Sequence, residues 1–425
     1  MRIRRSRRVR RIRTTAAAAA AGPAKTARAA ISLSACTVLL LPLAACTDAS
    51  PQSSSTSSPG GSAEAKNGDT APGAGTSAVP RRAVPRGRGS RVPDDLNGDG
   101  YPDLVLNDLV KAAGDTYGDD AGIGIVYGTK AGAGAGAKAG AGAKAGEGAD
   151  APRRFDPAVR QTLDPRERGA RVAGVLPAAF DAEAACDLDG DGFGDLIIAT
   201  DPPYNGIGVP PVPLQILFGG PDGPTGRAVV LKIPAKARAG DEWPDHPVCG
   251  DFDGDGEVDL AVTASGGQVS FLRGPFSRTG APRAATAPVQ GGGAALAAPE
   301  PKTDVNGDGY DDLVALPRPH APGAPARGTL LLGGPDGPGP QGGAYAFTAV
   351  RKPPAPRLPG VPTGKATTEI LRATDGYLVT RTHRSEKTDL IALYAPDPDP
   401  ETSGSGAPAY RPHPLLTFST AVFLD

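Results

Sequence analysis

The sequence predicts an all-β fold built from repeated units, and three observations support this prediction. A nine-residue phrase rich in acid and glycine occurs four times, at residues 95–103, 187–195, 251–259 and 304–312. A short aliphatic run follows each copy, as expected of a buried strand. A second apolar run ending in a glycine turn comes later in each repeat. Repeats of about 40–60 residues with four short strands each are typical of β-propeller blades.

The four phrases, called loops 1 to 4 in chain order, have the composition of calcium-binding loops. Oxygen side chains occupy positions 1, 3, 5 and 9, and glycine occupies positions 4 and 6. Calcium takes six to eight oxygen ligands, and glycine permits the sharp turn that brings alternate residues together. The predicted side-chain ligands are Asp95, Asn97, Asp99, Asp103, Asp187, Asp189, Asp191, Asp195, Asp251, Asp253, Asp255, Asp259, Asp304, Asn306, Asp308 and Asp312. The carbonyls at position 7 are further candidates, in Tyr101, Phe193, Glu257 and Tyr310.

Position 12 of the phrase argues against an EF-hand, which needs a bidentate glutamate there. Instead, the chain has Leu106, Ile198, Val262 and Ala315 at this position. Each loop is therefore expected to open onto a strand, with about four calcium ions bound per chain.

The repeat spacing predicts five blades. Loop starts are 92, 64 and 53 residues apart, and a fifth unit at residues 388–394 keeps the position-9 aspartate, Asp389, without the other ligands. Six or seven blades would require degenerate units inside the long intervals. Loop 1 lacks a preceding strand, so we expect the C-terminal strand to complete the first blade and close the ring.

The phrase D-x-(D/N)-G-D-G-x-x-D-L resembles FG-GAP/VCBS repeats, which build the integrin α-subunit head and many secreted bacterial propellers. The resemblance covers residues 95–425. It implies a calcium-stabilised propeller used for binding or adhesion, with calcium held at the blade edges. The Phe-Gly and Gly-Ala-Pro elements of the family are largely absent, and the familiar ring has seven blades.

The N-terminal region has the pattern of a bacterial lipoprotein leader. Residues 1–45 hold an arginine-rich start and an apolar run ending in Leu-Ala-Ala before Cys46. This predicts a signal peptide and lipidation of Cys46; ordinary cleavage or an uncleaved anchor are the alternatives. Residues 46–91 have the composition of a disordered tether, and the propeller is expected over residues 92–425. An Ala/Gly/Lys tract at residues 131–149 predicts a low-complexity loop insertion.

Charge and cysteine usage limit the partners. Residues 1–45 carry ten basic and no acidic residues, so their removal changes the net charge from −1 to −11, which argues against nucleic acid. Cys186 and Cys249 each lie just before a calcium loop, and export would permit a disulfide between them. Two buried thiols are the alternative, because their offsets from the loops differ by one residue.

No catalytic motif is present in the sequence, and the loop carboxylates are explained as metal ligands, so we do not expect an enzyme. The expected function is a lipid-anchored, calcium-binding surface module for adhesion or scaffolding, with calcium in a structural role. It would lie on the outer face of the bacterial cytoplasmic membrane, or be secreted without the lipid, and bind an extracellular protein or polysaccharide. The alternative is an extracellular hydrolase-like enzyme, or its accessory domain, acting on a surface polymer.

Overall fold

The computed structural model describes residues 79–109, 122–129, 154–171, 180–200, 214–238, 244–339, 341–354, 367–374, 377–385, 388–397 and 409–424. The predicted signal peptide, Cys46, the tether up to residue 78 and the insertion at residues 131–149 lie outside these residues. Everything described below belongs to the compact unit formed by residues 74–425.

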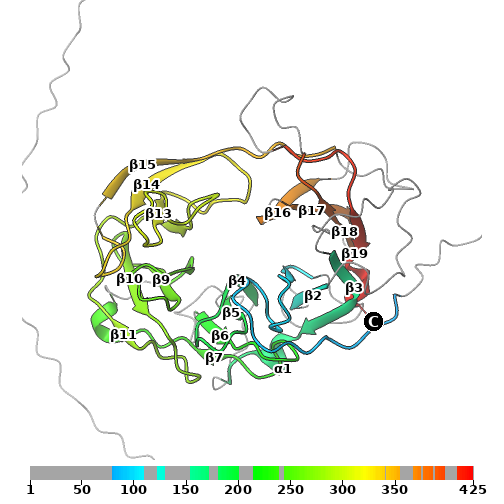
Figure 1. The fold of residues 1–425 in the computed structure, drawn as a ribbon, viewed down its shortest axis with the longest axis horizontal. Helices are drawn as coiled ribbons and strands as arrows, with labels where there is room; N and C mark the ends of the chain where they lie inside the picture. Colours follow the sequence, from blue (N-terminus) through cyan, green and yellow to red (C-terminus); the bar gives the residue numbers. More distant parts are fainter. Residues whose placement is uncertain are drawn as a thin grey trace, which may run out of the picture. The chain divides into compact units, whose positions relative to one another are not determined.

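The described residues form five antiparallel sheets arranged in a ring, which is a five-bladed β-propeller (Figure 1). The blades follow one another around the ring in chain order. Blade 1 contains β1 (Leu104–Leu106), β2 (Ile123–Thr129) and β3 (Arg154–Leu163). Blade 2 contains β4 (Asp181–Cys186), β5 (Asp195–Ala199), β6 (Leu214–Leu217) and β7 (Val229–Val230). Blade 3 contains β8 (Val248–Gly250), β9 (Asp259–Ala264), β10 (Gln268–Arg273) and β11 (Ala284–Ala285).

Blades 4 and 5 each have four strands. Blade 4 contains β12 (Ala295–Ala297), β13 (Leu313–Leu316), β14 (Ala326–Leu331) and β15 (Gln341–Phe347). Blade 5 contains β16 (Thr368–Thr374), β17 (Tyr377–Ser385), β18 (Thr388–Tyr394) and β19 (Leu416–Ser419). Helix is limited, among the described residues, to the four-residue α1 (Pro165–Arg168) and the short 3-10 turns η1 (Ala235–Ala237) and η3 (Thr420–Phe423). The prediction of an all-β propeller with five blades is confirmed.

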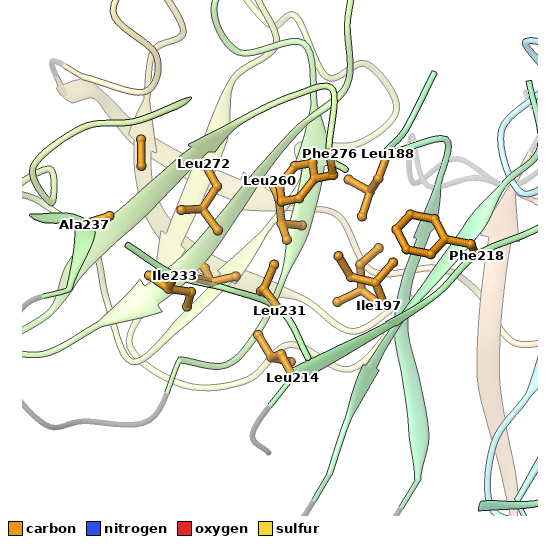
Figure 2. Packing of buried hydrophobic residues seen from close by; sticks show 13 residues of the cluster. Leu188, Ile197, Leu214, Phe218, Leu231, Ile233, Ala237, Leu260, Leu272 and Phe276 are labelled. Carbon is orange, nitrogen blue, oxygen red and sulfur yellow. The ribbon is translucent and has the colours of Figure 1, made fainter. Parts of the chain in front are cut away.

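The aliphatic run after each loop is explained by burial on both faces of a blade. Successive side chains of a strand point to opposite faces. In β5, Leu196 and Ile198 therefore join the core between blades 1 and 2, while Ile197 joins the core between blades 2 and 3. Figure 2 shows this second core, where Ile197 and Leu188 meet Leu260 of β9. At about 25 cal/mol per Å² of apolar surface, such interfaces are the main source of stability for the ring.

The expectation that the C-terminal strand completes blade 1 is wrong. The last strand, β19, pairs with β18 inside blade 5, and blade 1 has three strands among the described residues. The chain end instead reaches blade 1 through side chains, because Phe418 and Phe423 pack with Leu104, Leu106 and Val126 in one core.

The end of the expected tether also differs from the prediction. Residues 79–91 run along blades 1 and 2, where the Arg82 backbone N–H donates to Ala158 O at 2.7 Å and Val84 packs on the core. These backbone bonds reduce the freedom that the polar composition suggested. Within the described part of the chain, no helix has the length and apolar character needed to span a membrane.

Candidate metal centres

The four loops share one backbone conformation, which the glycines make accessible. Positions 4 and 6 have positive φ in every loop, between 66° and 93°, a region that favours glycine because it has no Cβ. The position-1 aspartate holds the turn by accepting a hydrogen bond from the position-6 N–H. This distance is 2.7 Å for Asp95, 2.7 Å for Asp187, 3.0 Å for Asp251 and 3.0 Å for Asp304. The predicted role of the glycines is confirmed.

The position-9 aspartate joins each loop to the strand that pairs next to the aliphatic one, which is β2, β6, β10 or β14. One oxygen accepts the N–H of the glycine that ends this strand, at 2.8 Å for Asp103–Gly128, 2.8 Å for Asp195–Gly219, 2.9 Å for Asp259–Gly274 and 3.0 Å for Asp312–Gly333. A Cβ on any of these glycines would collide with the carbonyl oxygen of loop position 8. The glycine turn that recurs in the sequence is therefore the partner of the loop.

Loops 2 and 3 each bring three carboxylates together. Oxygens of Asp187, Asp189 and Asp195 lie within 4.8 Å of one another, and so do oxygens of Asp251, Asp253 and Asp259. Two oxygens bound to one calcium ion at 2.3–2.6 Å can be separated by up to about 5 Å. The spacing and the all-oxygen donor set therefore fit a single calcium ion in each loop.

Several oxygens in these two loops are buried without a hydrogen bond. Asp189 Oδ1, Asp251 Oδ1 and Asp259 Oδ2 have no hydrogen-bond partner among the described residues. A buried carboxylate oxygen without a partner carries a desolvation cost, which a bound cation offsets. These oxygens are the observation on which the fit to a metal ion depends.

Burial raises the pKa of the carboxyl groups in the same loops. Desolvation, followed by the repulsion of neighbouring carboxylates, raises the pKa of Asp195 to about 8 and the pKa of Asp259 to about 7. For Asp189, desolvation and the charge of Asp191 raise the pKa to about 6. A divalent cation would reverse these shifts, because an adjacent positive charge favours the ionised form.

Three arginines lie at the openings of loops 2 and 3. Arg278, which follows β10, crosses from blade 3 to loop 2, where its Nε lies 2.7 Å from Asp189 Oδ2 and its guanidinium also pairs with Asp191. In loop 3, Arg273 Nη1 lies 3.0 Å from Asp253 Oδ2, and Arg283 pairs with Asp255. The arginines thus pair with positions 3 and 5, while the position-9 carboxylates, Asp195 and Asp259, are fully buried.

Loops 1 and 4 differ from loops 2 and 3 because position 3 is asparagine. In loop 1 the Asn97 side chain is buried, and its Oδ1 has no hydrogen-bond partner among the described residues. In loop 4 the side chains of Asn306 and Asp308 are exposed and hydrogen-bond to each other at 2.8 Å. The sixteen predicted side-chain ligands therefore lie in four similar loops with unequal burial.

Cys186 and Cys249 form a disulfide, with their Cα atoms 6.5 Å apart. Cys186 ends β4 and Cys249 lies in β8, so the bridge joins the strands that lead into loops 2 and 3. The one-residue difference in offset, which left the pairing open from the sequence, does not prevent the bridge.

Sequence reasoning missed the side chains outside the loops that contact the loop carboxylates. These are the three arginines and Ser90, which donates to Asp95 Oδ2 at 2.5 Å. The glycine that ends the strand paired next to each aliphatic strand was visible as a recurring turn, but the contacts of the arginines left no periodic signal.

The fold defines the class of protein, a five-bladed β-propeller, and an acidic loop precedes the aliphatic strand in four of its blades. Comparison of the chain with protein-family models, with curated proteins and with solved structures found no match.

Proposed function

We propose that this protein is a calcium-stabilised β-propeller that serves as a binding module. The observation that supports calcium most directly is the pair of three-carboxylate clusters in loops 2 and 3, with their buried oxygens that have no hydrogen-bond partner among the described residues. Asp187, Asp189 and Asp195 would hold one ion, and the equivalent residues of loop 3 a second. Loops 1 and 4 would hold further ions, with Asn97 and Asn306 supplying amide oxygens.

The role of calcium in this proposal is structural. Each loop connects two neighbouring strands of a blade or leads into the first strand, and its position-9 carboxylate also bonds to the end of the next strand, as in β2 and after β6. An ion between positions 1, 3 and 9 would offset the desolvation of these carboxylates and allow them to remain ionised in the fold.

A cleft between blades 3 and 4 supports the binding role. It measures about 500 Å³ and is lined by Asp245, His246, Thr263 and glycines of the β9–β10 turn. Asp245 and His246 precede β8, Thr263 lies near the end of β9, and the glycines follow β9. Loop 3 connects the other ends of the same two strands. The cleft is therefore on the side of blade 3 away from its acidic loop, and a ligand could bind there without displacing calcium.

The Asp245–His246 turn is held firmly at the cleft. The Asp245 backbone N–H donates to Thr263 Oγ1 at 2.9 Å, and the Thr263 backbone N–H donates to Asp245 O at 2.9 Å. His246 has a φ of 49°, a value that non-glycine residues adopt at a cost and that recurs at functional sites. We propose this cleft as the contact for an extracellular protein or polysaccharide.

The proposed location rests on the sequence of residues 1–46. Their basic start, apolar run and Leu-Ala-Ala-Cys ending favour export with a lipid on Cys46. Enzymatic action on a surface polymer is the second hypothesis, and the carboxylate and imidazole at the cleft are the groups that it would use.

Thermal unfolding with calcium and with chelator, together with a count of bound metal, tests the structural role. We expect a higher midpoint with calcium, because a ligand that binds only the folded state stabilises it. Asp189→Ala and Asp253→Ala should each lower the count by one ion, and Glu167→Ala on the exposed surface of α1 should not. An unchanged midpoint and no bound metal would exclude the calcium hypothesis.

Binding at the cleft needs a separate measurement. Asp245→Asn and His246→Ala should weaken adhesion of the purified protein to extracellular polysaccharide on a coated surface, without changing the calcium-dependent midpoint. Equal adhesion by these variants and the unmodified protein would remove the cleft from the proposal.

A further inference from the structure

Residues 85–91, called the strap here, lie across the first two acidic loops. The backbone N–H groups of Gly87 and Arg88 donate to loop 1, at 3.1 Å to Asn97 O and 3.0 Å to Gly98 O. The N–H of Ser90 then donates to Gly192 O of loop 2 at 2.7 Å. A segment with the composition of a flexible linker is thus bonded through its main chain to two candidate metal sites.

The close contact between strap and loops depends on glycine. A Cβ on Gly87 would collide with Asn97 O and with the backbone of Gly98. A Cβ on Gly192 of loop 2 would in turn press on Gly89 of the strap. The two backbones therefore pack directly on each other, and a single methyl group would separate them.

The strap also orients two of the predicted ligands of loop 1. The Ser90 hydroxyl donates to Asp95 Oδ2 at 2.5 Å. The Asn97 amide nitrogen donates to the strap carbonyl Pro85 O at 2.8 Å and to Asp99 Oδ2 at 3.2 Å. The amide nitrogen is thus held between the strap and the loop, and the buried Oδ1 of the same amide has no hydrogen-bond partner among the described residues.

We propose that the strap is a supporting layer of the loop 1 metal site, and that calcium in loop 1 locks the strap onto the propeller. This inference rests on the proposed calcium function. Ser90 and the Pro85 carbonyl act as positioning groups, in the way that outer-shell hydrogen bonds orient metal ligands. Because binding free energies are reciprocal, a docked strap raises the calcium affinity of loop 1 and bound calcium holds the strap in place.

The consequence concerns the attachment of the propeller. The strap continues a docked segment in which the Arg82 backbone N–H already donates to Ala158 O of blade 1, so strap docking adds to the contacts that hold this segment against blades 1 and 2. Arg86, Arg88 and Arg91 are exposed on the strap, which makes its release measurable by trypsin.

Two strap variants and one matched control in the full chain test the proposal. Gly87→Ala adds a methyl group where there is no room, and Ser90→Ala removes the bond to Asp95. Gly226→Ala is the control, because a Cβ there has nothing within 4 Å. The readouts are a calcium titration with a count of bound ions, and trypsin cleavage in saturating calcium mapped by mass spectrometry.

We expect the tightly bound ion count of Gly87→Ala and Ser90→Ala to fall by one, or one site to weaken by about tenfold or more. Cleavage after Arg86, Arg88 and Arg91 should accelerate in both variants, whereas cleavage after the exposed Arg351 of blade 4 should not. The Gly226→Ala control should match the unmodified protein.

The proposal is overturned if the strap variants bind calcium with unchanged count and affinity, or if their strap is cut no faster than in the control. Failure of the calcium function itself has a different signature, since the unmodified protein would then bind no calcium at all.

Discussion

Blades 3 and 5 each have an aspartate at the start of an aliphatic strand, Asp259 in β9 and Asp389 in β18. The surroundings of the two carboxylates differ. In blade 3, Asp259 is fully buried, with one oxygen bonded to Gly274 N and the other without a hydrogen-bond partner among the described residues. In blade 5, Asp389 lies 3.6 Å from Arg381 Nε and 3.1 Å from His383 Nδ1. Blade 5 supplies a cation for the carboxylate from its own chain, and for blade 3 we propose calcium in that place.

In the fifth unit, which has no acidic loop, the buried Asp389 is balanced by Arg381 instead. Arg381 is 2% exposed and also donates to Asn107 O of blade 1. Asn107 in turn pairs with the Ala182 backbone of blade 2, at 2.9 Å in both directions. The arginine therefore balances the charge of Asp389 and links blade 5 to blade 1 where the ring closes.

Removal of the internal cation should have the largest effect. Arg381→Met leaves Asp389 buried without its main partner, and breaking a buried ion pair from one side costs about 3–5 kcal/mol. Chemical denaturation in saturating calcium should show this loss, while the bound-ion count stays the same. Arg351→Met, at an exposed site of blade 4, is the control, and an equal stability of the two variants would contradict the role of Arg381.

The disulfide should come next, because it joins blades 2 and 3 covalently where blades 5 and 1 are joined by Arg381. We expect the double variant Cys186→Ser/Cys249→Ser to lose about 2–4 kcal/mol. A reducing agent should lower the unfolding midpoint of the unmodified protein and leave that of the double variant unchanged. A response of the double variant to the reducing agent would show that the effect arises elsewhere.

Replacing each aspartate by asparagine should change the free energy of unfolding with a different sign in blade 3 and in blade 5 when calcium is absent. Asp259→Asn keeps the bond to Gly274 and removes a buried charge, so it should stabilise the calcium-free protein by about 1–3 kcal/mol and destabilise the calcium-loaded protein. Asp389→Asn should be destabilising in both conditions, because Arg381 loses its buried carboxylate neighbour. Thermal unfolding of both variants with calcium and after its removal measures the four values; the same sign for Asp259→Asn in both conditions would break the comparison.

A change of pH is expected to have the smallest effect on the stability of the calcium-free protein. The folded pKa values of about 8 for Asp195 and about 7 for Asp259 exceed the ordinary value near 4. Such groups contribute stability at low pH that is lost as pH rises through the folded pKa. The calcium-free protein should therefore be more stable at pH 5.5 than at pH 8.5.

Calcium should reverse this slope, because protons then compete with the metal and acidification releases it. Denaturation curves at both pH values, with calcium and after its removal, check the two signs. Parallel slopes would mean that the loop carboxylates do not control the pH dependence.

Part of the candidate site follows from local sequence. The glycines at positions 4 and 6 need positive φ, the oxygen side chains recur at fixed spacing, and each loop precedes an aliphatic strand. These features depend on neighbours a few residues away, so they could be predicted from one repeat and checked against the next. The second glycine turn was visible too, although its bond to the position-9 aspartate was not.

Only the tertiary structure decided the contacts between repeats. The partner of β19, the Cys186–Cys249 bridge, the crossing of Arg278 into loop 2 and the docking of the strap all join residues far apart in the chain. Local propensity carries no information on them, because they depend on which edges and side chains meet when the ring closes. The sequence by itself determined the repeating blade and its acidic loop, and the closure of the ring decided which side chains of other repeats each buried aspartate meets.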